Sequence, residues 1–302
     1  MAGNCLRSIM LTVIIVSWNV RDLLRGCLTS LFVDLASAAP SSARVIVVDS
    51  ASTDGTPDLL RAEFPQVRLI AHADNIGFVK GNNLAMREIE NLKFKMQDGA
   101  ALKASLSALT SEFIWLLNPD TLVKPGATRT LIDFMRARPE CGMCGPTLCN
   151  PDGSLQHGAF AFPGLAQLFI DTVPCLGRWR NSRWDGRYPP AWFERPTPFQ
   201  IGFPLGAAML VRAQTLAEVG LLDEGYEMYS EEVDWAKRMA DAGWERWCVP
   251  AAKVLHYGGA STSQASARTK RILWQSRRRY FGKHYAPFKR WVALRWVKWL
   301  GY

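Results

Sequence analysis

Apolar residues in the first part of the chain form short runs that alternate with longer stretches of helical spacing. Four of these runs predict buried strands, at residues 11–17, 45–49, 67–71 and 113–117. Helical spacing between them predicts helices at residues 21–35, 57–64 and 81–91. Strands that alternate with helices in this way are typical of a parallel sheet with crossover helices, so we expect an α/β fold.

The pattern changes after this region. Pro, Gly and Trp are frequent at residues 139–206, where we expect loops and only short strands. A further strand is predicted at residues 206–211, and a helix at residues 231–242 with Gly243 as its C′ residue. We interpret the polar stretch at residues 91–111 as an insertion or a helix extension.

Basic residues are concentrated at the end of the chain. The net charge is +9, yet the last acidic residue is Glu245, and thirteen Lys or Arg follow it. The residues up to that point hold 23 bases against 27 acids. Aromatic residues are interleaved with the terminal cations, a combination typical of surfaces that bind anionic lipid or nucleic acid.

Seven cysteines and the lack of a recognisable signal peptide lead us to expect a cytosolic protein with reduced thiols. The apolar run at residues 9–16 is too short to span a bilayer. Cys141, Cys144 and Cys149 have neither a second cysteine pair nor a nearby histidine, which disfavours a zinc site. We interpret them as small buried residues around a strand and a turn at Gly145-Pro146.

Two acidic side chains occur where predicted strands end. Asp49 ends one strand before a turn rich in hydroxyl groups, and Asp120 follows another strand in the tripeptide Asn118-Pro119-Asp120. Open parallel sheets bind ligands at the carboxyl ends of their strands. Asp49 is therefore a candidate to bind a base or ribose, and Asp120 to hold Mg²⁺ or Mn²⁺ against a diphosphate.

Three more acids and a histidine complete the candidate chemistry. Glu231 and Glu232 fall in the first turn of a predicted helix, with Ser230 as a candidate N-cap. The helix dipole favours negative charge there, so either glutamate is a candidate anionic base, with Asp234 close by. His256 ends a short apolar stretch and is a candidate metal ligand, although such a histidine is also typical of a hydrogen-bonded core.

Two common nucleotide-binding signatures are missing from the sequence. No GxGxxG follows the first strand, and no Walker A sequence occurs anywhere. These absences argue against a nicotinamide-dependent dehydrogenase and a P-loop nucleotidase.

Six short motifs follow one another along the chain, at residues 13–19, 48–56, 75–83, 117–121, 204–207 and 231–235. Their order and approximate spacing resemble those of the family 2 glycosyltransferases, especially the bacterial rhamnosyltransferase-like branch. The resemblance runs from Leu11 to about Tyr285. The resemblance implies a GT-A fold, in which helices flank a mostly parallel central sheet. It divides the chain into a nucleotide-binding half at about 9–125, an acceptor-side half at about 126–265, and a helical tail at 266–302.

The resemblance also assigns residues to the donor site. Asp49 would contact the base of the nucleotide, and Ser17 and Asn19 would line its pocket. A loop would enclose nucleotide and sugar, and its residues are Asn75, Gly77, Phe78 and Asn82. Asp120 matches the last acid of the family's metal-binding DxD motif, and Asn118 stands at the first position of that motif.

For catalysis, the resemblance implies direct displacement with inversion. Glu232 would be the base, where the family usually has the Asp of a Glu-Asp pair. Its longer side chain shifts the carboxylate by roughly one bond length, so Glu231 and Asp234 stay open as alternatives. A divalent cation, Mg²⁺ or Mn²⁺, would be held by Asp120 and His256.

The branch favours dTDP-L-rhamnose as the nucleotide-diphosphate sugar donor. The acceptor would be a lipid-linked glycan or polysaccharide of the bacterial cell envelope, held on polyprenyl diphosphate. The tail predicts peripheral attachment to an anionic membrane surface at the inner face of the cell membrane. We expect the side chains of Asp49, Asp120, Glu232 and His256 to converge on one cleft.

Two other functions fit part of the sequence. A module that binds nucleic acid or anionic lipid, on a non-catalytic α/β scaffold, explains the tail but leaves the ordered carboxylates without a role. A nucleotidyltransferase has a similar nucleotide-binding half but normally has a Gly-rich, basic loop early in the chain, which is absent here. A glycosyltransferase with no nucleic-acid partner explains more of the sequence.

Overall fold

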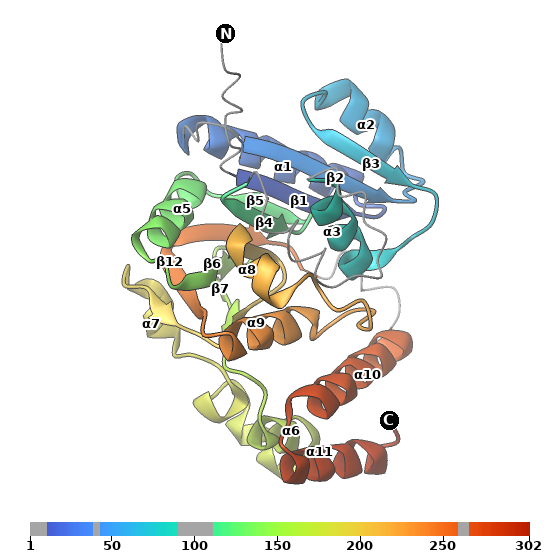
Figure 1. Ribbon diagram of the computed structural model, residues 1–302, viewed down its shortest axis with the longest axis vertical. Coiled ribbons are helices and arrows are strands. Elements are labelled where there is room, and N and C mark those ends of the chain that lie inside the picture. The colour runs from blue at the N-terminus through green and yellow to red at the C-terminus, as the bar shows by residue number, and fades with distance from the viewer. Residues whose placement is uncertain (1–10, 39–42, 90–110, 259–265) are drawn as a thin grey trace.

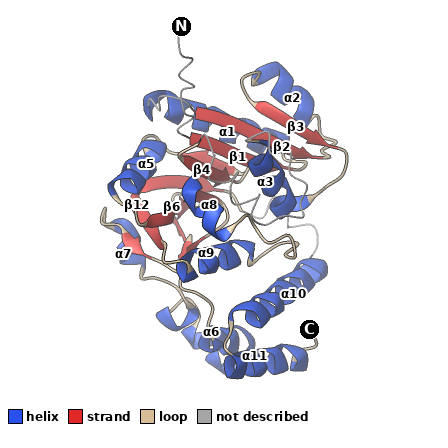
Figure 2. Cartoon of the chain, viewed as in Figure 1, coloured by secondary structure: helices blue, strands red, loops and turns tan. Residues whose placement is uncertain are grey.

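The computed structural model describes residues 11–38, 43–89, 111–258 and 266–302. Nearly all of the stretch interpreted as an insertion, residues 91–111, lies outside the described residues. Within the described ranges one large mixed sheet forms the centre of the molecule, and helices cover both of its faces (Figure 1). The two C-terminal helices lie at one end, beyond the sheet (Figure 2).

The sheet has the strand order β3-β2-β1-β4-β11-β6-β12-β5. The first four strands are parallel and comprise β1 (Leu11–Ser17), β2 (Ala43–Ser50), β3 (Arg68–His72) and β4 (Phe113–Leu117). The others are β11 (Ala208–Arg212), β6 (Cys141–Cys149), β12 (Glu245–His256) and β5 (Thr121–Val123). Strand β11 is antiparallel to both neighbours, β6 is parallel to β12, and β5 is antiparallel to β12. The predicted α/β class is confirmed.

Helices are divided between the two faces of the sheet. One face is covered by α1 (Arg21–Ala38), α2 (Thr56–Glu63) and α5 (Ala127–Ala137). The other face is covered by α3 (Gly77–Glu88), α8 (Ala213–Val219) and α9 (Glu231–Asp241).

The segment between β6 and β11 consists of short elements. In chain order these are β7 (Leu155–Gln156), β8 (Ala159–Phe160), α6 (Leu165–Thr172), 3-10 turns at Pro174–Trp179 and Arg183–Asp185, α7 (Pro190–Glu194), β9 (Phe199–Gln200) and β10 (Phe203–Pro204). The tail forms α10 (Ser266–His284) and α11 (Pro287–Trp299).

The run of apolar residues in β1 is explained by burial on both faces. Val13 and Ile15 pack with Leu28 of α1 on one side, whereas Ile14 packs with Val79 of α3 on the other. Alternate side chains of a strand point to opposite faces, so a strand covered on both faces is apolar throughout. Apart from Thr12, which bonds the Ser111 hydroxyl, the polar side chain of β1 is Ser17 at its carboxyl end, where the candidate site lies.

Helix α3 begins four residues before the predicted start. The side-chain oxygen of Asn75 accepts a hydrogen bond from the Gly77 amide at 3.0 Å, and the Ser50 hydroxyl accepts one from the Ile76 amide at 2.8 Å. These bonds fix the turn that starts the helix, and Gly77 has a φ of 73°, which glycine adopts without strain. Gly77, Phe78 and Asn82 therefore lie in a helix and not in the expected loop.

The turn expected at Gly145-Pro146 is wrong, because β6 runs through both residues. Strand β6 pairs with β11 only near Met143 and Cys144, so the missing N–H of Pro146 interrupts no pairing on that side. Gly145 is required by packing, since an added Cβ would lie 2.6 Å from the Pro204 side chain.

We expect Gly145→Ala to lower the free energy of unfolding by about 1–3 kcal/mol, because the added carbon meets rigid Pro204. The control is Gly282→Ala in α10, where an added Cβ meets nothing within 4 Å. For Gly282→Ala we expect the free energy of unfolding to rise by about 0.5–1 kcal/mol. Thermal denaturation of both variants tests this packing, and equal stabilities would contradict it.

Candidate active site

Ser17 and Asp49 end neighbouring strands and are partners in the register of β1 and β2. Both side chains are buried. The Asp49 Oδ2 atom accepts a hydrogen bond from the Ser52 amide at 3.1 Å, but Asp49 Oδ1 and the Ser17 hydroxyl have no partner among the described residues. A buried polar atom without a partner is costly, so this pair fits a site that a polar ligand completes.

Asn19 and Asn75 accept hydrogen bonds that stabilise the turns next to Ser17 and Asp49. The side-chain oxygen of Asn19 accepts a hydrogen bond from the Thr53 amide at 2.7 Å, and Asn19 has a φ of 51°. Asn75 starts α3, as described above, and the Asn82 amide group donates to the Phe78 carbonyl at 2.9 Å. The described contacts of these three asparagines thus shape the backbone around the site.

Asp120 and His256 lie side by side, as predicted. The Asp120 Oδ1 and His256 Nε2 atoms are 3.4 Å apart, and both residues are buried. The His256 Nδ1 atom lies 2.7 Å from the Gln156 side-chain oxygen, while the Gln156 amide nitrogen donates to Asn150. This arrangement places a proton on Nδ1, which donates to Gln156, and leaves Nε2 as the ring nitrogen on the side of Asp120.

The donor set fits a divalent cation that also binds phosphate. An imidazole lone pair that faces a carboxylate is stabilised by a cation bound between them, and Gln156 orients the ring as outer partners of metal ligands do. No cluster of three or more His, Cys, Asp or Glu with metal-binding geometry occurs in the described part of the chain. Mg²⁺ commonly takes one or two protein ligands and completes its shell with phosphate and water.

The start of α9 is strained and buried. Tyr229 and Ser230 have φ values of 66° and 65°, in the left-handed region that costs about 1–3 kcal/mol for a non-glycine residue. Ser230 occupies the N-cap position, but its side chain makes no capping hydrogen bond, so its predicted capping role is wrong. Glu231 and Glu232 follow with only 6% and 8% of their surface exposed.

Burial changes the expected charge of these two glutamates. Loss of solvation raises the pKa of Glu232 to about 7, although backbone amides at the helix start lower it. Burial, and then the neighbouring charge of Glu232, raise the pKa of Glu231 well above its usual value. One oxygen of each side chain has no partner among the described residues. Desolvation thus outweighs the helix dipole and raises both pKa values, and the role of either glutamate as the anionic base stays a prediction.

Asp234 has a different environment from the two glutamates. Its carboxylate is fully buried and lies 2.8 Å from the Arg238 Nε atom and 2.7 Å from the His284 Nε2 atom. Burial opposes ionisation, but the His284, Lys283 and Arg238 side chains together hold the pKa of Asp234 well below its usual range. Asp234 thus joins α9 to α10, and its oxygens are already bound.

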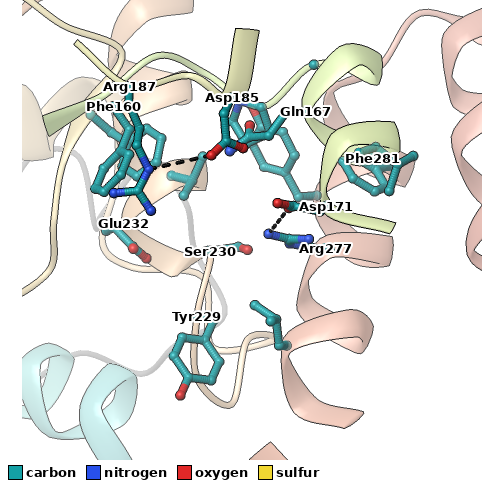
Figure 3. Close-up of a pocket in the computed structure, with 17 residues that line it drawn as sticks. Phe160, Gln167, Asp171, Asp185, Arg187, Tyr229, Ser230, Glu232, Arg277 and Phe281 are labelled. Atoms are coloured by element: carbon teal, nitrogen blue, oxygen red, sulfur yellow. Dashed lines mark ion pairs between the residues drawn. The ribbon is translucent and has the colours of Figure 1, made fainter. Parts of the chain in front are cut away.

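Glu232 lines a cavity of about 250 Å³ between α6, α9 and α10, which we name the sugar-sized cavity (Figure 3). Its polar lining residues are Gln167, Asp171, Asp185, Arg187, Tyr229, Ser230, Glu232 and Arg277. Asp49, Asp120 and His256 are not among the residues that line it. The structure therefore brings Ser17 to Asp49 and Asp120 to His256, while the convergence of all four predicted side chains on one cleft stays a prediction.

Sequence reasoning missed several residues of this region. Gln156, which orients His256, lies one hundred residues before it in the chain. Gln167 and Asp171 belong to α6, within the segment interpreted as loops, and Arg277 belongs to the tail interpreted as a membrane-binding surface. No local motif marks these residues, because only the packing of α10 against α6 and α9 brings them together.

Comparison with known proteins places the chain in a family. The sequence model described as Glycosyl transferase family 2 matches residues 12–91. The N-acetylglucosaminyl-diphospho-decaprenol L-rhamnosyltransferase of Mycobacterium tuberculosis is 31% identical over 259 residues, which cover 85% of this chain and 79% of that protein. The rhamnosyltransferase WbbL of Escherichia coli is 24% identical over 202 residues, or 66% of each chain.

Solved structures show the same fold. The crystal structure of GalNAc-T7 with UDP, GalNAc and Mn²⁺ superposes with a TM-score of 0.54 and 13% identity, over 82% of this chain and 44% of that chain. Such a likeness supports the GT-A architecture expected from the sequence. With a relative 31% identical across most of its length, the chain is a member of the family 2 glycosyltransferases.

Proposed function

We propose that the protein transfers L-rhamnose from dTDP-L-rhamnose to N-acetylglucosamine on a polyprenyl diphosphate, in a metal-dependent reaction with inversion. The donor and acceptor are those favoured by the rhamnosyltransferases to which the chain is similar. The observation that carries the proposal is Glu232, a buried carboxyl group with a pKa of about 7 that belongs to a cavity lining and has one oxygen without a partner in the described ranges.

In this reaction, an acceptor hydroxyl oxygen attacks the anomeric carbon of the donor sugar. A new C–O bond forms, the bond to the nucleotide diphosphate breaks, and Glu232 takes the hydroxyl proton. A single attack opposite the leaving group inverts the anomeric carbon. General-base help of this kind is typically worth about 10² to 10⁴ in rate, and it is most effective when the pKa lies near the working pH.

The nucleotide-sugar donor is bound by the polar residues at or near the ends of the strands. The Asp49 carboxylate, whose Oδ1 atom has no partner among the described residues, accepts a hydrogen bond from the nucleoside, and the Ser17 hydroxyl donates or accepts another, beside the turn that Asn19 supports. Asp120 and His256 would hold the divalent cation. When bound, that cation neutralises charge on the departing diphosphate.

We expect Glu232→Gln to lower turnover at least about 10²-fold, because an amide cannot accept the proton. In the wild type, kcat/KM should fall about tenfold for each pH unit below 7 and level off above it, because the base must be ionised. The matched control is Glu194→Gln on the exposed face of α7, which should keep the wild-type profile. Near-normal turnover of purified Glu232→Gln would refute this role for Glu232.

The same substitution should not unfold the protein. The folded pKa of Glu232 lies above its usual value, so its contribution to stability is lost as pH rises towards and through 7. Gln in its place removes that penalty, and we expect its melting temperature at pH 8 to equal or exceed that of the wild type. A large fall in melting temperature would show that Glu232 is needed for folding instead.

We expect Asp120→Ala to abolish most turnover and to weaken Mn²⁺ binding in the presence of dTDP, measured by electron paramagnetic resonance. Gln156→Leu should weaken Mn²⁺ binding about 10- to 100-fold, because it frees the His256 ring to turn. The exposed Asp58→Ala in α2 is the control. Unchanged Mn²⁺ affinity in both site variants would contradict a metal site at Asp120 and His256.

For the tail, we propose attachment to an anionic membrane surface at the inner face of the cell membrane. Phe288, Trp291 and Trp299 are 74%, 58% and 74% exposed, and their spacing along α11 puts them on one side of the helix with Arg295. Aromatic rings and cations are the groups that bind to anionic lipid interfaces. None of the described helices combines the length and apolar character needed to cross a bilayer.

We expect joint replacement of Phe288, Trp291 and Trp299 by Ser to abolish flotation with vesicles that contain anionic lipid. The control replaces Trp184 and Trp192, exposed aromatic residues outside the tail, and should float normally. These surface changes are cleaner than deletion of α11, because α11 also buries Ala293 and Val297 in the core. Equal flotation of the two variants would count against the tail as the attachment site.

A further inference from the structure

The sugar-sized cavity has polar groups that no described protein atom satisfies. The side-chain oxygen of Gln167 in α6 is buried without a partner, and so is one oxygen of Glu232 in α9. Both residues line the cavity (Figure 3). Buried polar atoms are normally hydrogen-bonded, and because both side chains line the same cavity, a small rotation of either would bring its unsatisfied oxygen to a ligand that carries donor groups.

Charges in the sugar-sized cavity are arranged in pairs. Asp171 lies 2.7 Å from Arg277 and Asp185 lies 3.5 Å from Arg187, so each carboxylate faces a guanidinium. The apolar part of the lining includes the rings of Phe160, Phe203, Tyr280 and Phe281. Paired charges leave little net attraction for a strongly charged ligand. Planar hydrogen-bonding groups with aromatic rings instead suit a neutral pyranose, which has both hydroxyl groups and apolar faces.

A second cavity adjoins the first and has different chemistry. We name it the tail cavity; it is about 390 Å³, shares Pro163, Gly164 and Tyr280 with the sugar-sized cavity, and has a mainly apolar lining. Lys237 and Lys289 belong to its lining, and the Lys237 ammonium group is paired with Asp241. Cations beside apolar walls suit a diphosphate joined to a hydrocarbon chain.

The tail helices fix the geometry of both cavities. The Tyr285 hydroxyl donates to the Pro163 carbonyl at 3.1 Å, and the Trp296 indole donates to the Thr172 hydroxyl at 2.9 Å. These two bonds hold both ends of the α6 segment in place. Gln167 and Asp171 of this segment line the sugar-sized cavity. The tail, which carries exposed aromatic residues, is thus hydrogen-bonded to the α6 wall of the sugar-sized cavity, which Glu232 also lines.

We infer that the two cavities together bind the acceptor, with its sugar in the sugar-sized cavity and its diphosphate and first lipid carbons in the tail cavity. Gln167 then sets acceptor specificity, because its side-chain oxygen accepts a hydrogen bond from a hydroxyl or amide N–H of the sugar. The inference rests on the proposed role of Glu232 as the base that deprotonates this sugar.

The test compares Gln167→Leu with a matched control, Gln66→Leu, at an exposed position between α2 and β3. The acceptor probe is N-acetylglucosaminyl diphosphate with a short alkyl chain, assayed in detergent without vesicles. We expect Gln167→Leu to raise the acceptor KM about three- to tenfold, the effect of one lost hydrogen bond. The donor KM and the hydrolysis of donor without acceptor should not change. An unchanged acceptor KM, or an equal rise in both KM values, would overturn the inference.

Folding of the variant is not expected to obscure the result. The Gln167 oxygen has no described partner, so its removal should leave the melting temperature unchanged or higher. If Gln167→Leu does not fold, the volume-conserving Gln167→Met is assayed in its place.

Lys289→Met tests the tail cavity separately. It should raise the KM of the diphosphate acceptor and not that of an alkyl N-acetylglucosaminide, which has no diphosphate. Equal effects on the two acceptors would overturn the assignment of the tail cavity.

Failure of the proposed rhamnose transfer can be told apart from failure of the acceptor-site inference. If the wild type transfers no rhamnose to the diphosphate acceptor, the proposed function fails, and calorimetric titration with the same acceptor then decides the inference. Saturable binding that Gln167→Leu weakens would support the acceptor site without the transfer. Binding that is absent, or equal in wild type and variant, would overturn it.

Discussion

The protein keeps two carboxyl groups, Glu231 and Glu232, out of water at the start of one helix. Removing charge from solvent is costly, and the two residues before them adopt strained left-handed conformations. Backbone amides at the start of α9 offset part of this cost but leave both pKa values raised. A carboxyl group that titrates near neutral pH and belongs to the lining of a cavity is suited to accept a proton during a reaction. The proposed chemistry depends on this arrangement.

The rest of the fold gathers polar groups at the ends of its strands and beside the tail. Strands buried on both faces concentrate polar side chains at their ends, which brings Ser17 beside Asp49 and places Asp120 next to His256. The same helix start would be much less enclosed without the tail, because α10 contributes Arg277 to the cavity wall and its His284 binds Asp234. The tail is therefore part of the candidate site as well as its proposed link to the membrane.

Much of the nucleotide-binding half could be predicted from sequence, because continuous apolar runs such as 113–117 specify buried strands and a polar residue directly after them marks the sheet edge. The acceptor side could not be predicted in the same way. Strand β6 contains Gly145 and Pro146, which indicate a turn locally, and only the approach of Pro204 explains why Gly145 lies within a strand. The role of Gln167 arises from contacts between distant elements, which have no local signal. The raised pKa values of Glu231 and Glu232 could not be predicted either, because the extent of their burial is a tertiary property.

We propose that donor and base meet across one cleft, and a crystal structure with Mn²⁺ and a non-hydrolysable dTDP-rhamnose analogue tests this arrangement most directly. We expect the nucleoside against Asp49, the cation near the diphosphate and the Asp120–His256 pair, and the anomeric carbon facing the cavity that Glu232 lines. A nucleotide bound away from the edge formed by β1, β2 and β4, or a donor sugar separated from Glu232 by protein, would contradict it.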